Sequence, residues 1–171
     1  MRKLIKRLRG ENGQALVELA FVLPLVLLFL FGIIDFGLAL NTQNEDTNIA
    51  NIAVREAAVV GTTTTATCTL NGTATTETTL DQWTQCEAQV LGETPPANVC
   101  VYDTATSTTG TTYTTGDPVE VKLSSTFGWL KLITGRVGNL SSTIGADATM
   151  RVEGTLTGTN PFLTNPGTMT C

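Results

Sequence analysis

The longest hydrophobic run of the chain lies near its N-terminus. Residues Leu19–Ile34 include no charged or strongly polar side chain, and with its flanks the segment Gln14–Leu40 spans 27 residues. A helix needs about 20 predominantly apolar residues to cross a membrane. The pattern therefore predicts a single transmembrane helix at residues 14–40, with the acids Glu18 and Asp35 near its two edges.

A helical period continues after this run. Apolar residues recur at i, i+3, i+4, i+8 and i+11, which places them on one helix face; they are Ile49, Ile52, Ala53, Ala57 and Val60. This spacing predicts an amphipathic extension of the helix at residues 41–61, ended by Gly61. The two segments together would form a helix of roughly 70 Å. Its first half would be a membrane anchor and its second half the support of a globular head.

The pattern changes after Gly61. Residues 81–91 have the spacing of a short helix, for which Asp81 is the expected N-cap and Gly92 the expected terminator. Apolar and polar residues alternate at 119–124 and 146–153, which predicts two strands, and a further strand is expected around Val99 and Val101. The apolar residues 127–133 are expected to form a loop or a short helix. A helix followed by strands predicts an α+β fold with a small antiparallel sheet packed on the C-terminal half of the long helix.

The head is expected to cover residues 62–153. Residues 154–171 are rich in Thr, Gly, Asn and Pro and are predicted to form a flexible tail. Threonine-rich runs occur at 62–65, 73–79 and 104–115. We interpret these runs as surface loops or β-prone segments, with O-glycosylated loops as the alternative.

Positive charge is concentrated at the start of the chain. Five bases precede Gly13 and only Glu11 opposes them; the bases are Arg2, Lys3, Lys6, Arg7 and Arg9. This leader, residues 1–13, places the N-terminus in the cytoplasm by the positive-inside rule, so that the head is exported. Without the leader, five bases and fourteen acids remain, a net charge of −9 instead of −5. Such an acidic head argues against nucleic acid as a partner.

All four cysteines follow the apolar run and lie on the side predicted to be exported: Cys68, Cys86, Cys100 and Cys171. Four cysteines in an oxidising compartment predict two disulfides, with three connectivities open. We favour Cys86 with Cys100 and Cys68 with Cys171, because the first pair would close a compact loop and the second would hold the tail. Zinc binding is disfavoured, since the short paired spacings of zinc sites are absent.

The chain has no histidine. This excludes histidine-based catalytic triads and most metal sites. The sequence also lacks a phosphate-binding glycine loop and a nucleophile with a credible base. We therefore expect no enzymatic activity, no catalytic residues, no metal and no cofactor.

Several short motifs together resemble the TadE-like family, minor pilin-like proteins of the tight-adherence branch of type IV pili. They are Gly13–Glu18, Leu23–Leu25, Asp35–Gly37, Asn51–Ala58 and, later in the chain, Met150–Glu153. The combination of a glycine, an acid five residues later, a proline in the apolar run and the sequence Arg-Glu-Ala-Ala carries the resemblance. The chain departs from the family at Leu19, where relatives often have an aromatic residue.

The resemblance implies a pilin-like fold and a role in pilus assembly. A prepilin peptidase would cut between Gly13 and Gln14, and the carboxylate of Glu18 would pair with the new N-terminus of a neighbouring subunit. The implied partners are the major pilin, other minor pilins, the pilus assembly platform and the peptidase. The implied location is the bacterial inner membrane, crossed once, with incorporation into the pilus as a further option.

Two other functional classes compete with this one. An uncleaved single-span membrane protein with an exported structural or binding head would retain its leader. A membrane-tethered enzyme has little support, because the acids of the head are scattered singly along the sequence.

Overall fold

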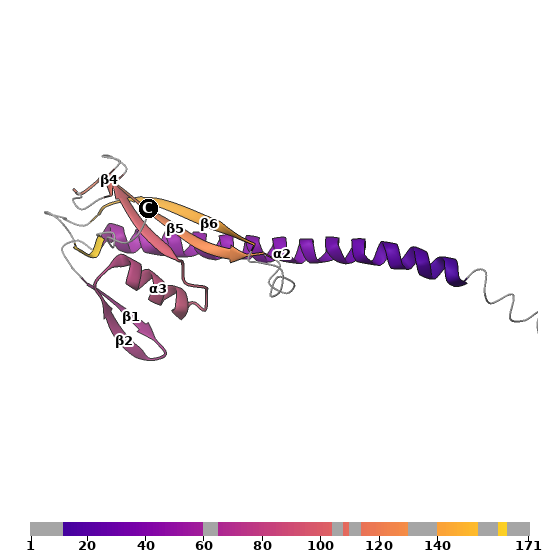
Figure 1. The fold of residues 1–171 in the computed structure, drawn as a ribbon. Helices are drawn as coiled ribbons and strands as arrows, with labels where there is room; N and C mark the ends of the chain where they lie inside the picture. Colours follow the sequence, from indigo (N-terminus) through magenta and orange to yellow (C-terminus); the bar gives the residue numbers. More distant parts are fainter. Residues whose placement is uncertain are drawn as a thin grey trace, which may run out of the picture.

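The computed structural model describes residues 12–59, 65–103, 108–109, 114–129, 140–153 and 161–163. One long helix, α2 (Asn12–Val59), extends far beyond a head of strands and a shorter helix that surrounds its C-terminal half (Figure 1). The predicted fold class is confirmed, because a long apolar N-terminal helix is followed by small antiparallel sheets.

Helix α2 is continuous over 48 residues, a length of about 72 Å. It continues through Pro24, although proline removes one backbone hydrogen bond. The two halves of the helix differ in burial. All side chains from Gly13 to Leu30 are exposed, whereas buried positions recur at helical spacing from Ala39 onward. Only the second half of α2 is therefore covered by the head.

The C-terminal half of α2 presents a face of small residues to the head. Ile49, Ala53 and Ala57 are buried as predicted, Ile52 is half-buried, and Val60 lies outside the described residues. A second row adds to this face: Ala50, Val54 and Ala58. Because alanine has no side chain beyond Cβ, chain from the head can approach the helix backbone. The backbone N–H of Glu153 donates to the carbonyl oxygen of Ala58 at 2.9 Å.

The main sheet has four antiparallel strands in the order β4-β3-β5-β6. Their bounds are Asn98–Asp103 for β3, Thr108–Thr109 for β4, Pro118–Gly128 for β5 and Ser141–Arg151 for β6. Alternate residues of β5 are buried, as the sequence pattern predicted: Val119, Val121, Leu123 and Ser125. β5 extends beyond the predicted 119–124 at both ends, and Phe127 and Gly128 end it instead of starting a loop or helix. β6 begins before the predicted 146–153 and ends at Arg151.

A second, two-stranded sheet is a hairpin of β1 (Ala66–Leu70) and β2 (Thr73–Glu77). It turns at Asn71 and Gly72, whose φ values of 51° and 80° are both positive. Two consecutive positive φ values are typical of a type I′ hairpin turn, which favours Asn-Gly. This dipeptide between β-prone threonine runs was a hairpin signal that the sequence analysis did not use.

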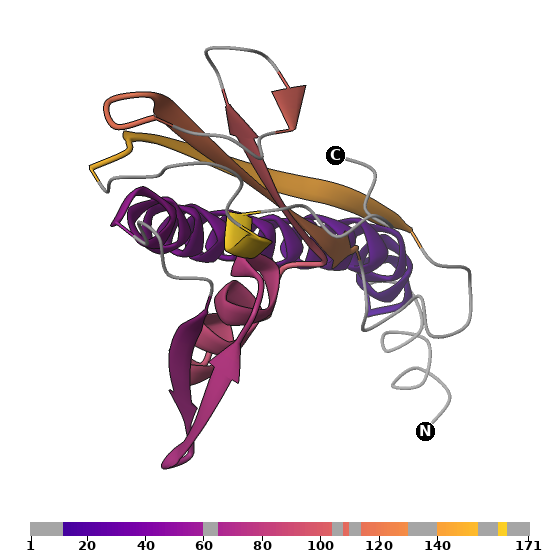
Figure 2. The ribbon, with the colours of Figure 1, turned by 90° about the vertical axis from the view of Figure 1, so that its left-hand side faces the viewer.

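Helix α3 (Leu80–Val90) packs against this hairpin, on a side of α2 away from the main sheet (Figure 2). Its N-cap is Thr79, whose side chain accepts a hydrogen bond from the backbone N–H of Gln82 at 3.3 Å. The expectation that Asp81 caps the helix was therefore wrong by two residues. Gly92 terminates the helix as predicted, with a φ of 75°. The N–H of Glu93 bonds back to Ala88 in a Schellman motif.

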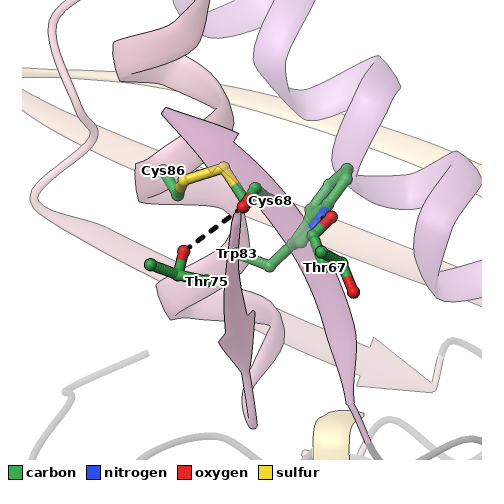
Figure 3. The surroundings of a disulfide bond; sticks show 5 residues. All are labelled: Thr67, Cys68, Thr75, Trp83 and Cys86. Carbon is green, nitrogen blue, oxygen red and sulfur yellow. Dashed lines mark hydrogen bonds between the residues drawn. A yellow bond between two sulfur atoms is a disulfide. The ribbon is translucent and has the colours of Figure 1, made fainter. Parts of the chain in front are cut away.

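The disulfide of this unit differs from the favoured pairing. Cys68 of β1 is bonded to Cys86 of α3, so neither the Cys86–Cys100 nor the Cys68–Cys171 pairing is right (Figure 3). The reason is tertiary: β1 packs directly on α3, whereas β3, which holds Cys100, belongs to the other sheet. Cys100 is also disulfide-bonded, and Cys171 lies outside the described residues.

A short segment near the C-terminus joins the core. The 3-10 helix η1 (Pro161–Leu163) contains Phe162 and Leu163, whose side chains are completely buried. Both belong to the same hydrophobic cluster as Ala53 and Ala57 of α2. This anchor was not expected, because the polar composition of residues 154–171 predicted a flexible tail for the whole segment.

Candidate functional site

The peptide bond between Gly13 and Gln14 lies in the first turn of α2, where both residues are exposed. Apart from the adjacent residues and the backbone of the same helical turn, no atom of the described residues lies within 4 Å of the point where a Cβ on Gly13 would stand. The first four N–H groups of a helix have no partner within it, and helix ends fray easily. This bond is therefore accessible and held by few interactions. The predicted leader bases lie outside the described residues.

Glu18 is an exposed acid on an otherwise apolar surface. It lies four residues after Gln14, and side chains at i and i+4 share one face of a helix. Residues three and four positions along a helix lie beside each other on its surface, so Phe21 and Val22, both exposed, are neighbours of Glu18. Within the described part of the chain Glu18 forms no ion pair. A carboxylate in this position needs a partner from outside whenever the surrounding surface is covered by other helices.

The N-terminal half of α2 exposes large apolar side chains at most positions from Leu16 to Leu40. It is the one helix of the described residues that is long and apolar enough to cross a membrane, and the rest of the chain buries none of its most apolar part. Soluble monomers rarely expose apolar patches of more than a few hundred Å². This surface therefore fits a membrane or a bundle of similar helices.

The model of a known protein family matches this helix. The family is described as TadE-like protein, and the match covers residues 13–58. The segment 13–58 is TadE-like. The match includes nearly all of α2 and confirms the resemblance seen at Gly13–Glu18 and Asn51–Ala58, whereas the head lies outside it. No curated protein and no solved structure matches the chain. The TadE-like segment suggests a protein associated with Tad pili.

A buried acid joins the TadE-like helix to the head. Asp46 is only 2% exposed, and its Oδ1 accepts a hydrogen bond from Ser125 Oγ of β5 at 2.7 Å. Its other oxygen, Oδ2, is buried without a hydrogen-bond partner among the described residues. Burial raises the pKa of Asp46, the hydrogen bond from Ser125 lowers it, and the charges of Glu45 and Glu93 raise it. Sequence reasoning missed Asp46, although it lies three residues before Ile49 on the same helix face.

The raised pKa makes the stability of the head depend on pH. Because the pKa of Asp46 is raised in the folded chain, the folded chain binds this proton more tightly than the unfolded chain. The free energy of unfolding therefore rises as pH falls through the folded-state pKa toward the ordinary value of 3.8. We expect Asp46→Asn to reduce the rise in unfolding free energy between pH 7 and acid pH. Guanidinium unfolding of the full chain in detergent, followed over this pH range, measures the effect.

Asp117 provides a control of opposite sign. Hydrogen bonds from the side chain and the backbone of Thr114 lower its pKa from 3.8. Its contribution to stability is therefore lost as pH falls, and Asp117→Asn should make the acid-side rise larger. If the unfolding free energy of Asp46→Asn had the same pH dependence as that of the wild type, the role given to Asp46 in the contact between α2 and β5 would be contradicted.

Other chemistry-bearing groups do not converge. Across the described ranges, no three His, Cys, Asp or Glu residues are placed to hold a metal ion. Among the described residues, one shallow groove lies between the β1–β2 hairpin and α3. Another lies between α2 and the end of the β5–β6 hairpin, beside Trp129.

Proposed function

We propose that the chain is a minor pilin-like subunit, a pseudopilin, that supports the assembly or initiation of a tight-adherence pilus. The observation that carries the proposal is the TadE-like match, which begins at Gly13 and follows the exposed apolar helix to Ala58. In this proposal prepilin peptidase removes residues 1–13, residues 14–40 cross the inner membrane, and residues 41–61 continue the helix into the head. The head, residues 62–153, is exported, and residues 154–171 follow it.

The orientation proposed is N-terminus in the cytoplasm. Two features support it: the leader bases favour the cytoplasmic face, and the Cys68–Cys86 disulfide suits an oxidising exterior. The proposed partners are the major pilin, other minor pilins, the assembly platform and the peptidase. The head would then present its acidic surface outside the cell membrane.

The mechanism follows from the spacing of Gln14 and Glu18. Cleavage creates an α-ammonium group on Gln14, about 6 Å along the helix axis from Glu18. Two helices packed side by side with this offset bring the carboxylate of one level with the ammonium of the other. Each charge is costly alone in an apolar bundle, and each neutralises the other. The pair therefore selects one register among the many that a uniform apolar surface would allow.

The direct test is deletion of the gene in its host. We expect loss of tight-adherence pili from the cell surface, seen by electron microscopy of sheared filaments, and restoration by the wild-type gene in trans. Normal numbers of pili and normal adhesion in the deletion strain would contradict an assembly role.

A further inference from the structure

The β5–β6 hairpin lies along α2 and ends near the middle of that helix (Figure 1). Its far end is bonded to α2 through Glu153 and Ala58. From Glu153 back to Ile144 a strand covers about 30 Å, and from Ala58 back to Leu40 the helix covers about 27 Å. Ile144 is therefore about level with Leu40, and Trp129 lies further toward the N-terminus of α2. The described end of the hairpin therefore reaches the level of Phe36–Leu40, just before the apolar run gives way to Asn41.

A groove at this level contains side chains from both elements. Phe36, Ala39 and Leu40 line it from α2, and Trp129 and Ile144 line it from the hairpin. Phe36 and Leu40 remain 58% and 45% exposed, which shows that the hairpin does not cover them. The apolar surface of the helix therefore continues directly onto the tip of the hairpin.

The tip is held by its own interactions. The backbone N–H of Trp129 donates to the carbonyl oxygen of Leu140 at 2.8 Å, and the indole N–H donates to Ser142 Oγ at 2.7 Å. The rings of Phe127 and Trp129 are in edge contact, with centroids 5.1 Å apart. Leu140 beside them is 62% exposed. The tip thus combines a satisfied polar group with aromatic and aliphatic surface.

This combination is the one that the membrane–water interface favours, because an indole is apolar over most of its surface and polar at its N–H. The level of Trp129 along the helix axis agrees with this preference for the interface. From Glu18 to Phe36 the helix rises about 27 Å, which is close to a hydrocarbon core of about 30 Å with Glu18 at one edge and Asp35 and Phe36 at the other. Trp129 would then lie at the level of the lipid headgroups.

We propose that the described end of the β5–β6 hairpin, which contains Phe127, Trp129 and Leu140, is a second membrane contact that enters the headgroup region of the outer leaflet. The bilayer is the occupant favoured here, because the tip is continuous with the apolar surface of the proposed span. This contact fixes the head against the membrane while the subunit waits for assembly. The inference rests on the proposed transmembrane placement of α2.

Trp129 is one of two tryptophans in the chain, so its depth can be measured by fluorescence. The full chain with Trp83→Phe is placed in phosphatidylcholine vesicles at low protein density. The vesicles carry a quenching nitroxide either near the headgroups or deep in the acyl chains. We expect the shallow label to quench Trp129 more strongly than the deep label. The reciprocal variant Trp129→Phe reports Trp83 of α3, which should be quenched by neither.

A third variant separates this inference from the proposed span. Phe29 lies midway between Glu18 and Leu40, so Phe29→Trp in a chain with both tryptophans replaced by phenylalanine should be quenched best by the deep label. If it is not, the transmembrane placement fails and this inference fails with it. If Phe29→Trp is quenched but Trp129 is not, only the second contact is overturned. Protection of Trp129 that appears only at high protein density would instead assign the tip to a second copy of the chain, and would also overturn the proposal.

Discussion

Replacing Glu18 by alanine is expected to leave the chain inserted and folded but to prevent its incorporation into pili. In a packed helix bundle the new α-ammonium of a neighbour would lose its partner. Removing one member of a buried ion pair costs about 3–5 kcal/mol, and each 1.4 kcal/mol is about a tenfold change in an equilibrium constant. The amount of the variant in sheared filaments, relative to the amount in membranes, should therefore fall more than about a hundredfold.

Two further variants separate the charge of Glu18 from its shape. Glu18→Gln keeps the size of the side chain and removes the charge, so it should be as defective as Glu18→Ala. Glu18→Asp keeps the charge on a shorter side chain and should retain partial incorporation. Val17→Ala, a neighbouring exposed position, serves as the matched control. Wild-type incorporation of the Gln and Ala variants would show that Glu18 is only an interfacial acid.

Replacing Phe162 by alanine should destabilise the head severely. Phe162 is completely buried and is among the largest fully buried side chains of the described residues. Substituting a core phenylalanine by alanine costs about 3–5 kcal/mol, because apolar contacts are lost and a cavity remains. Guanidinium unfolding of the full chain in detergent, followed by tryptophan fluorescence, gives the change in unfolding free energy.

The control for Phe162 is Met150→Ala on β6, where the side chain is 38% exposed. Its effect should be much smaller than that of Phe162→Ala. A Phe162→Ala variant within about 0.5 kcal/mol of the wild type, the usual range for surface substitutions, would mean that η1 does not anchor the chain to the core.

The elements with a strong period could be predicted from the sequence. The apolar run and the face around Ala53 predicted α2, and the alternation from Val119 to Leu123 predicted β5, because local spacing reports which side of an element is buried. The same pattern identified Glu18, since a charge within an apolar run is conspicuous without any knowledge of the fold. The role of Gly13 was implied by the resemblance to the TadE-like family.

Features that depend on which elements meet could not be predicted in the same way. Cys68 pairs with Cys86 because the β1–β2 hairpin packs on α3, and no local period encodes that contact. Phe162 is an isolated apolar residue in a polar segment, so composition alone hides it. Asp46 was within reach of the sequence, because an acid on the buried face of an amphipathic helix contradicts the pattern around it.

The roles of Gly13 and Glu18 stay predictions of a different kind, since they depend on molecules outside this chain. The structure shows an exposed glycine at the start of a helix and an exposed acid one turn beyond Gln14. Both features fit the proposed cleavage and the proposed pairing between subunits. Neither is sufficient, because the peptidase and the neighbouring helix supply the other half of each interaction.

The central claim, that the chain is a processed pilin-like subunit, is tested most directly by its N-terminus. The intact mass and N-terminal sequence of the protein should be measured after extraction from membranes of its native host, in cells with active prepilin peptidase. The account predicts that the wild-type chain begins at Gln14. It also predicts that a Gly13→Phe variant is not cleaved and keeps its basic leader. A wild-type chain that still carries Arg2, Lys3, Lys6, Arg7 and Arg9 would contradict the account and would leave a permanent single-span anchor with an exported head.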